Sequence, residues 1–391
     1  MLSLCHIFSD AKFVDASMAY FISDLYENKA VFIGDAKSYK GNYGKIIEFV
    51  EYQEKNAIEK IMNICGKHDV IICYNLDYHK SIIVNRLPSD KKIVWRFFGT
   101  EFYSLPQQQL NILSDKTKKV LNINSYNNIK EEIVRVLRFF KYALRLKRTP
   151  IAEFNKAVNK IHYFLSFDEG EYATIRKNWN VFPEFLEISS LAGFAKRSTL
   201  SIKNNNIVIG NSRAHENNHF DIIDLFDEGM VAQNNSLVFP LSYGHKGIYY
   251  HRLIDRIKSS KIETHIIEDF LPFDSYVEKI ANAKAAIINS YRQMGLGNML
   301  IFLGNNTKLY LSERNPSFKW MTSLGFSIYS VEKDLKKDIE MNNFNLETHI
   351  GEKNKNIVDK LSDDGNRLNF QNTFYRTLRY GTDKVLNRNI F

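Results

Sequence analysis

The most constraining feature of the sequence is a regular alternation of short apolar runs with longer amphipathic segments. Runs expected to form buried strands lie at residues 2–8, 30–33, 69–74, 92–97 and 161–167, with helical spacing of apolar residues between several of them, most clearly over residues 13–26. Such alternation favours a parallel, doubly wound sheet, because each crossover helix packs on a face of the sheet. We therefore predict a Rossmann-like domain over residues 1–190.

A second set of strand and helix patterns begins after a looser stretch near residues 185–200. Apolar strands are expected at residues 207–210, 236–241, 261–267, 285–288 and 308–311. A chain of 391 residues is also too long for one ordinary core. We predict a second Rossmann-like domain over residues 195–365, facing the first across a cleft, and a helical tail over residues 366–391.

Charge and cysteine content restrict the class of protein. The net charge is +9, which favours an anionic partner such as nucleic acid, anionic lipid or a phosphorylated substrate. The three cysteines (Cys5, Cys65 and Cys73) lie in apolar patterns without a C-x-x-C pair, so we expect neither a disulfide framework nor a zinc site. We expect no signal peptide and no membrane span, because the apolar runs are too short.

Residues 131–148 (EEIVRVLRFFKYALRLKR) combine an apolar stripe with a basic stripe at helical spacing. The predicted membrane-binding residues of the basic stripe are Arg138, Lys141, Arg145 and Arg148. A basic amphipathic helix of this kind can lie on anionic lipid. The same pattern also fits a helix with a solvated basic face, or a nucleic-acid contact, although no recognised nucleic-acid motif accompanies it.

Two glycine-containing turns follow apolar strands in the second half and predict an anion site. One turn holds Arg292, Gln293, Gly295 and Gly297 before a helix expected to start near Asn298; the other holds Gly210, Asn211 and Ser212, and Tyr243 and Gly244 end the next strand. Glycines allow close backbone approach, free N–H groups at a helix start favour negative charge, and arginine is a forked donor. The alternative is that these glycines serve only the turns.

Other candidates come from residue types at strand ends. Asp10 and Glu101 follow strands of the first domain, where ligands bind in doubly wound sheets, so either carboxylate is a candidate catalytic base. Asp10 equally suits a helix cap. His215 and His219 have the spacing of a metal pair, but no third ligand is evident, so we predict no metal site.

Several short motifs occur in a characteristic order. They are W-R-F-F-G-T-E-F-Y (95–103), I-G-N-S-x(4)-N-x-H (209–219), P-L-S-Y-G (240–244), L-P-F-D-x-Y (271–276), R-Q-x-G-x-G (292–297) and R-N-P (314–316). The set resembles the TDP-N-acetylfucosamine:lipid II N-acetylfucosaminyltransferase (4-acetamido-4,6-dideoxygalactosyltransferase) family. The resemblance covers residues 95–103 and most of residues 207–335.

The resemblance implies a GT-B glycosyltransferase that acts in bacterial surface polysaccharide synthesis. It implies a nucleotide-diphosphate deoxysugar donor, favouring a TDP-sugar, and a polyprenyl-diphosphate-linked glycan acceptor at the cytoplasmic face of the inner membrane. The two glycine turns, together with Arg314 and Asn315, would hold the diphosphate and the sugar, and arginines would replace a metal, so no cofactor is expected. The first domain would bind the acceptor.

Two other functional classes stay open. A sugar-nucleotide epimerase could have a similar two-domain fold, and it would consume donor without an acceptor. A basic lipid- or nucleic-acid-binding module would not bind nucleotide sugars. If the chain is a glycosyltransferase of the resembled family, we expect a peripheral membrane enzyme with no nucleic-acid partner.

Overall fold

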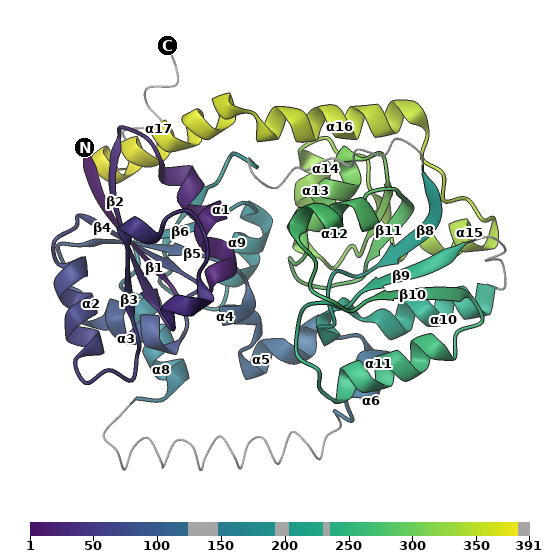
Figure 1. Ribbon diagram of the computed structural model, residues 1–391, viewed down its shortest axis with the longest axis horizontal. Coiled ribbons are helices and arrows are strands. Elements are labelled where there is room, and N and C mark those ends of the chain that lie inside the picture. Colours follow the sequence, from purple (N-terminus) through teal and green to yellow (C-terminus); the bar gives the residue numbers. More distant parts are fainter. Residues whose placement is uncertain (124–147, 192–202, 230–234, 382–391) are drawn as a thin grey trace. The chain divides into compact units, whose positions relative to one another are not determined.

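The computed structural model describes residues 1–123, 148–191, 203–229 and 235–381. Within these residues the chain forms two compact units, each built on a parallel sheet flanked by helices (Figure 1). The first unit contains residues 1–102, 148–190 and 363–381, and the second contains residues 103–123, 191, 203–229 and 235–362. The prediction of two doubly wound sheets is confirmed.

The first unit contains a seven-stranded parallel sheet in the order β3-β2-β1-β4-β5-β6-β7. Its strands are β1 (Leu2–Phe8), β2 (Tyr26–Ile33), β3 (Ile47–Val50), β4 (Val70–Tyr74), β5 (Lys92–Arg96), β6 (Tyr163–Ser166) and β7 (Glu184–Glu187). The strand order reverses between β1 and β4. The carboxyl ends of those two strands are therefore the switch point where ligands bind in such sheets.

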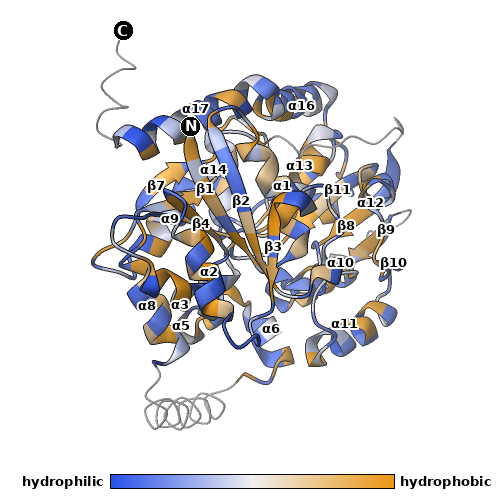
Figure 2. Ribbon diagram, turned by 60° about the vertical axis from the view of Figure 1, so that its left-hand side comes forward, coloured by the Kyte–Doolittle hydropathy of each residue, from blue (hydrophilic) through white to orange (hydrophobic). Residues whose placement is uncertain are grey.

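Helices and 3₁₀ turns connect the strands of the first unit. They are η1 (Ala11–Phe13), α1 (Val14–Met18), η2 (Ala19–Phe21), η3 (Ala36–Ser38), η4 (Gly44–Ile46), α2 (Ala57–Cys65), α3 (Tyr78–Arg86), α8 (Pro150–Val158), α9 (Glu169–Arg176) and α17 (Asp364–Tyr380), with α4 (Thr100–Tyr103) at the boundary. Trp95, on the interior strand β5, is completely buried and packs edge-on against Phe164. Figure 2 shows hydrophobic strands inside and hydrophilic outer helix faces.

Two strands of this sheet and one helix boundary differ from the sequence predictions. The edge strands β3 and β7 were not expected, because each lacks the continuous buried run of a central strand. The single helix expected over residues 13–26 is instead η1, α1 and η2, followed by the start of β2. The helical path ends at Ile22, whose backbone is extended, and Asn28 Nδ2 donates to the Phe21 carbonyl to fix this turn.

The second unit contains a six-stranded parallel sheet in the order β10-β9-β8-β11-β12-β13. Its strands are β8 (Asn204–Ile209), β9 (Ser236–Pro240), β10 (Glu263–Ile267), β11 (Ala283–Ile288), β12 (Lys308–Leu311) and β13 (Tyr329–Ser330). The strand order reverses between β8 and β11. Both glycine turns follow these two strands, so the predicted anion site lies at the switch point of the second sheet.

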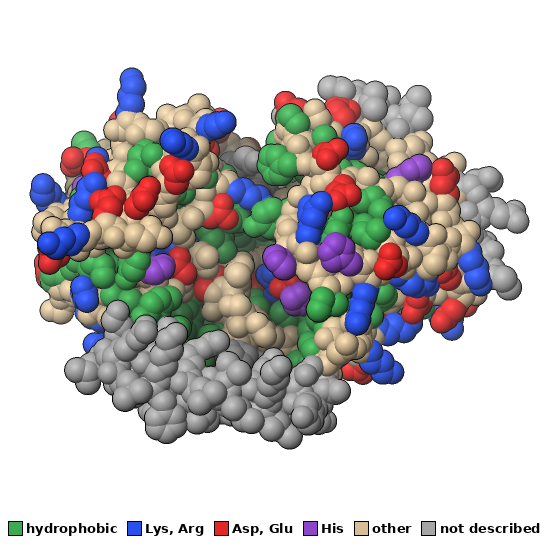
Figure 3. Space-filling view, turned by 60° about the horizontal axis from the view of Figure 1, so that its bottom comes forward, with side chains coloured by type: hydrophobic (Ala, Val, Ile, Leu, Met, Phe, Trp, Pro, Cys, Tyr) green, Lys and Arg blue, Asp and Glu red, His purple; other side chains and the backbone are tan. Residues whose placement is uncertain are grey.

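The helices of the second unit cover both faces of its sheet. They are α5 (Pro106–Gln109), η5 (Leu110–Ile112), α6 (Asp115–Val120), η6 (His215–Asn217), α10 (His219–Gly229), α11 (Ile248–Lys258), α12 (Phe273–Ile280), α13 (Leu296–Gly304), α14 (Pro316–Ser323), α15 (Leu335–Glu340) and α16 (Thr348–Ser362). Among the described residues, no helix has both the length and the apolar character needed to cross a membrane. Figure 3 shows acidic and basic side chains interspersed on the visible surface.

Two segments lie in a different unit from their sequence neighbours. Residues 103–123, which the sequence placed in the first domain, cluster with the second unit, where Ser114 N donates to Asn218 Oδ1 at 2.9 Å. The tail helix α17 packs on the first unit. Its Phe374 ring lies 5.1 Å from the Phe21 ring, and Gln371 Nε2 donates to the Tyr20 carbonyl at 3.0 Å.

Candidate functional site

The first glycine turn follows β8 and requires glycine at position 210. Gly210 has φ +71°, and a Cβ there would lie 2.6 Å from His219 Nε2. Its N–H donates to the Ile287 carbonyl of β11 at 2.9 Å, which ties the turn to the neighbouring strand. A side chain at position 210 would therefore strain the backbone and collide with the start of α10.

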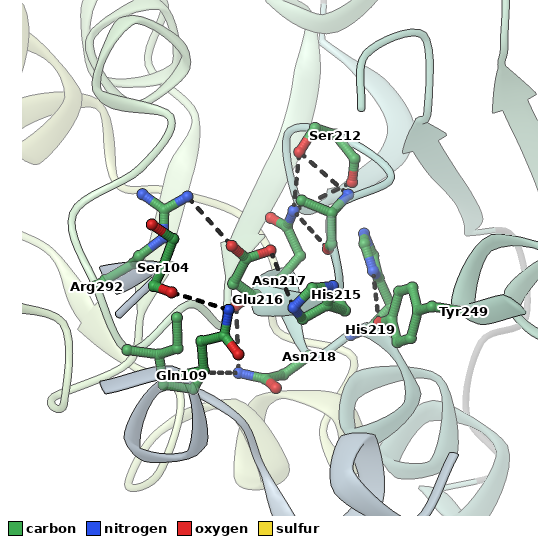
Figure 4. A network of polar contacts seen from close by, with 12 residues as sticks. Ser104, Gln109, Ser212, His215, Glu216, Asn217, Asn218, His219, Tyr249 and Arg292 are labelled. Carbon is green, nitrogen blue, oxygen red and sulfur yellow. Dashed lines mark hydrogen bonds and ion pairs between the residues drawn. The ribbon is translucent and has the colours of Figure 1, made fainter. Parts of the chain in front are cut away.

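Two asparagines hold the loop between β8 and α10 (Figure 4). Asn217 accepts from Asn211 N at 3.2 Å and donates to the Ser212 carbonyl and hydroxyl oxygens, both at 3.1 Å. Asn218, with φ 49°, donates to the Asn289 carbonyl at the end of β11 at 3.0 Å. Side-chain hydrogen bonds thus fix the loop that carries Asn211 and Ser212.

The second glycine turn lies between β11 and α13. Gly295, with φ +72°, directly precedes the helix, and a Cβ there would lie 3.0 Å from Asn211 Cγ, so the two turns are in contact. The helix begins at Leu296, two residues before the predicted start, and Gly297 lies in its first turn. Asn298 donates to Tyr276 Oη at 2.6 Å. The first N–H groups of α13 are available to an anion, since no side chain caps them.

Arg292 lies beside these turns and is 8% exposed. Its NH2 lies 3.4 Å from Glu216 Oε1, its NH1 donates to the Gln293 carbonyl at 3.3 Å, and its guanidinium carbon lies 5.7 Å from the centre of the Tyr103 ring. Figure 4 shows Glu216 between Arg292 and His215. Arg292 is thus a buried forked cation whose charge is balanced by one carboxylate.

Arg314 and Asn315 lie in the turn after β12 and differ in their roles. Asn315 donates to Ser290 Oγ at 2.9 Å and to the Arg292 carbonyl at 2.8 Å, and it caps α14 by accepting from Ser317 N at 3.0 Å. It therefore holds the β11 turn in place. Arg314 is exposed and stacks on the Tyr291 ring at 3.7 Å.

Arg213 is a candidate that sequence reasoning missed. Its side chain is 6% exposed, its guanidinium carbon lies 5.2 Å from the centre of the Tyr250 ring, and its N–H donates to the Tyr243 carbonyl at 2.9 Å. Tyr243 itself is half exposed, and Gly244 has φ +111°. The only sequence pattern that points to Arg213 is an arginine three residues after a strand-end glycine. That pattern is too common to identify a functional residue.

Several buried polar atoms at this switch point have no hydrogen-bond partner among the described residues. They are Asn211 Oδ1, Arg213 Nε, Arg292 Nε and Gln293 Nε2. Buried donors and acceptors are normally paired, because an unpaired group keeps its full desolvation cost. Their concentration here marks the switch point as the part of the second unit that suits a polar ligand.

The two histidines of the β8 loop do not form a metal pair. His219 is buried, its Nδ1 lies 3.1 Å from Tyr249 Oη, and burial lowers its pKa to about 3. His215 Nε2 lies 3.8 Å from Glu216 Oε2. Within the described ranges, no group of three histidine, cysteine or acidic side chains is arranged to hold a metal ion.

The switch point of the first sheet carries a separate polar cluster, formed by Ser9, Asp77 and Lys80. Ser9 Oγ donates to Asp77 Oδ2 at 3.0 Å, and Lys80 Nζ contacts both groups. Lys80 is fully buried, whereas the Asp77 side chain is 31% exposed. Burial alone would raise the pKa of Asp77, but the Lys80 ammonium and the hydrogen bonds hold it below its ordinary value. Sequence reasoning did not single out Lys80.

The two predicted catalytic carboxylates lie in different surroundings. Asp10 is exposed and caps η1 by accepting from Lys12 N at 3.0 Å. Glu101 is buried, its Oε1 accepts from Trp95 Nε1 at 2.9 Å and from Phe98 N at 3.1 Å, and burial raises its pKa. Their catalytic roles stay predictions.

Of the predicted membrane-binding residues, Arg138, Lys141 and Arg145 lie outside the described residues. Arg148 is exposed, and its NH1 lies 3.6 Å from Glu153 Oε1.

Solved structures with the same arrangement of sheets define the class of fold. Sucrose-phosphate synthase from Thermosynechococcus elongatus shares 9% identity, with a TM-score of 0.67 over 98% of this chain and 100% of that one. Anabaena Alr3699/HepE, in complex with UDP and glucose, shares 10% identity, with a TM-score of 0.63 over 97% and 100%. AviGT4, a glycosyltransferase involved in avilamycin A biosynthesis, shares 10%, with a TM-score of 0.57 over 98% and 99%. The fold is GT-B.

The family model for 4-alpha-L-fucosyltransferase, glycosyl transferase group 56, matches residues 126–350. The match spans more than half of the chain, so the protein belongs to this family and is a glycosyltransferase of the fucosyl type. A search of the curated proteins found no match. The predicted fold and enzyme class are confirmed.

Proposed function

We propose that the protein transfers a fucose-type sugar, an acetamido-deoxyhexose in the form implied by its motifs, from a nucleotide-diphosphate donor. The observation that carries this proposal is the contact between the two glycine turns at the β8/β11 switch point, beside Arg292 and the N-terminus of α13. Backbone N–H groups and a buried guanidinium are the groups that bind a diphosphate. The UDP named with Anabaena Alr3699/HepE, whose fold is similar, supports a nucleotide donor.

The proposed chemistry needs stabilisation of a leaving nucleoside diphosphate. Negative charge develops on the diphosphate as the bond from the sugar carbon to phosphate oxygen breaks. Arg292 and the N-terminus of α13 are positioned before the reaction, so they can stabilise that charge without large reorganisation. We propose that these groups serve in place of a metal ion, and that a TDP-sugar is the preferred donor.

The acceptor is proposed to be a polyprenyl-linked glycan bound by the first unit. The exposed edge of Ser9 and Asp77 at the β1/β4 switch point offers hydrogen-bonding groups for a sugar hydroxyl. Asp10 and Glu101 stay the proposed candidates for the base that removes the proton of the attacking hydroxyl. Such an acceptor would place the enzyme at the cytoplasmic face of the bacterial inner membrane, in surface polysaccharide assembly.

Arg292→Ala is expected to weaken nucleotide-sugar binding by about 1.5–3 kcal/mol, the range for a hydrogen bond to a charged group. The measurement is isothermal titration with TDP-, UDP- and GDP-sugars, repeated in EDTA, where the affinity of the native protein should not change. Lys319→Ala removes an exposed cation of the same unit and serves as the control. An unaltered affinity in Arg292→Ala would remove Arg292 from the site, whereas no binding by the native protein would refute the donor proposal itself.

Membrane contact through residues 131–148 is a separate proposal, supported by the basic stripe in the sequence. Reversing Arg138, Lys141, Arg145 and Arg148 to Glu should release the protein from anionic liposomes, because each basic residue near the surface contributes about 1 kcal/mol. Co-sedimentation with anionic and with neutral vesicles measures the effect. Equal recovery of native and variant protein on anionic vesicles would assign the stripe to a solvated face.

A further inference from the structure

Arg213 carries a charge that no described residue pairs at close range, although the Glu268 carboxylate interacts with it electrostatically. Its side chain is 6% exposed, yet its guanidinium makes no hydrogen bond and no ion pair with any described residue. The Tyr250 ring beneath it supplies a cation–π contact at 5.2 Å, worth about 0.5–2 kcal/mol. The Arg213 Nε is buried and has no hydrogen-bond partner among the described residues, and an unpaired buried donor keeps its full desolvation cost.

The acidic group near Arg213 is already engaged. Glu268 accepts from Lys246 Nζ at 2.5 Å and also from Tyr250 Oη. The Lys246 ammonium lies 5.4 Å from the centre of the same Tyr250 ring, so two cations contact one aromatic ring. One carboxylate thus faces two cations, which leaves an excess of positive charge beside Tyr250.

The loop after β9 is shaped to place Arg213. A Cβ at position 244 would lie 2.8 Å from Arg213 Cγ, so a side chain there would displace the arginine. Gly244 also has φ +111°, and the Tyr243 carbonyl accepts from Arg213 N at 2.9 Å. The strand-end glycine of the P-L-S-Y-G motif thus makes room for Arg213, and Gly244 is a positioning residue.

Arg213 and Arg292 differ in how their charges are matched. Arg292 has Glu216 as a partner at 3.4 Å, so an incoming anion must share or replace that carboxylate. Arg213 has no such partner among the described residues. It follows β8, whereas Arg292 follows β11, so the two arginines come from the two strands of the switch point. An anion that binds at this edge would gain more free energy from Arg213 than from Arg292, because no existing ion pair of Arg213 must be broken.

We propose that Arg213 is the principal anion-binding residue of the second unit and that its ligand is the diphosphate of a nucleoside diphosphate. The inference rests on the proposed donor site and adds a residue to it. The guanidinium fork suits phosphate oxygens, and the Tyr250 ring lies 5.2 Å from its central carbon. Gly244 acts through Arg213 and not on the ligand.

The test compares diphosphates with nucleosides. The ligands titrated are UDP, TDP, uridine, thymidine and inorganic pyrophosphate. Arg213→Met should weaken UDP and TDP binding by about 10- to 100-fold and abolish pyrophosphate binding. The affinity for the two nucleosides should be unchanged. Arg213→Lys should restore only part of the affinity, since it keeps the charge and loses the fork. The loss should be at least as large as in Arg292→Ala. Arg379→Met, which removes an exposed arginine stacked on Tyr375 in the first unit, is the matched control.

Each result decides between specific alternatives. Unchanged UDP, TDP and pyrophosphate affinity in Arg213→Met overturns the inference, while the donor proposal stands. An equal loss of affinity for nucleosides also overturns the inference, because it would indicate a purely structural role of Arg213 on Tyr250. Native protein that binds no nucleotide refutes the donor proposal instead. If Arg213→Met does not fold, Gly244→Ala serves as the second variant, and undiminished binding of diphosphates by folded Gly244→Ala overturns the inference.

Discussion

Asp77→Ala is expected to destabilise the first unit by about 3–5 kcal/mol, because it leaves the Lys80 ammonium buried without its carboxylate. Lys80 is fully buried, and its Nζ contacts only Asp77 and Ser9 as polar partners among the described residues. Asp77 also caps α3 by accepting from Lys80 N at 2.9 Å, and loss of that cap adds about 0.5–2 kcal/mol. Urea unfolding followed by tryptophan fluorescence measures the loss, since Trp95 and Trp179 both lie in this unit.

A double variant separates charge from packing. Asp77→Ala/Lys80→Met should recover most of the stability lost in Asp77→Ala, because it removes the unpaired charge and keeps a side chain of similar length. Asp77→Asn keeps the cap and loses only the charge, so it should lie between the native protein and Asp77→Ala. If the double variant is no more stable than Asp77→Ala, the ion pair is not the source of the effect.

The parts of the fold that could be predicted are those determined by local residue patterns. Central strands such as β4 are continuous buried runs, and the two glycine turns stand at strand ends, so both the sheets and the position of the glycine turns followed from pattern alone. The edge strands β3 and β7 have mixed burial and few residues. Their pairing depends on the neighbouring strand, which no local pattern reveals.

Two candidate functional residues, Arg213 and Lys80, were not predicted from the sequence for a related reason. The position of the Arg213 side chain depends on the space left by Gly244, which lies in a different loop 31 positions later. The burial of Arg213 follows from how those two loops pack. Lys80 looks in sequence like a surface residue on a helix, but its side chain turns back to the strand ends beneath Ser9. In both cases the important property is a charge that becomes buried through tertiary contacts. Residue type and spacing do not encode that property.

Acid is expected to destabilise both units, by about 2 kcal/mol for each buried histidine between pH 6.5 and about pH 5. Burial lowers the pKa of His219, in the second unit, from 6.5 to about 3, and burial lowers that of His6, in the first unit, to about 4. Below pH 6.5 the unfolded chain takes up protons that the folded protein does not accept until near those lower values. Stability therefore falls as the pH falls through this window, at about 1.4 kcal/mol per pH unit for each histidine.

The measurement is the free energy of unfolding at half-unit steps from pH 7.5 to 5, compared with histidine variants. His219→Gln should lower stability at neutral pH, because the contact of Nδ1 with Tyr249 Oη is altered, but it should flatten the pH dependence of the second unit. His349→Gln replaces an exposed histidine of the same unit and should leave the slope unchanged. A slope that is the same in His219→Gln and in the native protein would show that other groups, such as paired carboxylates, dominate acid unfolding, because protonation of a group absent from the variant cannot contribute.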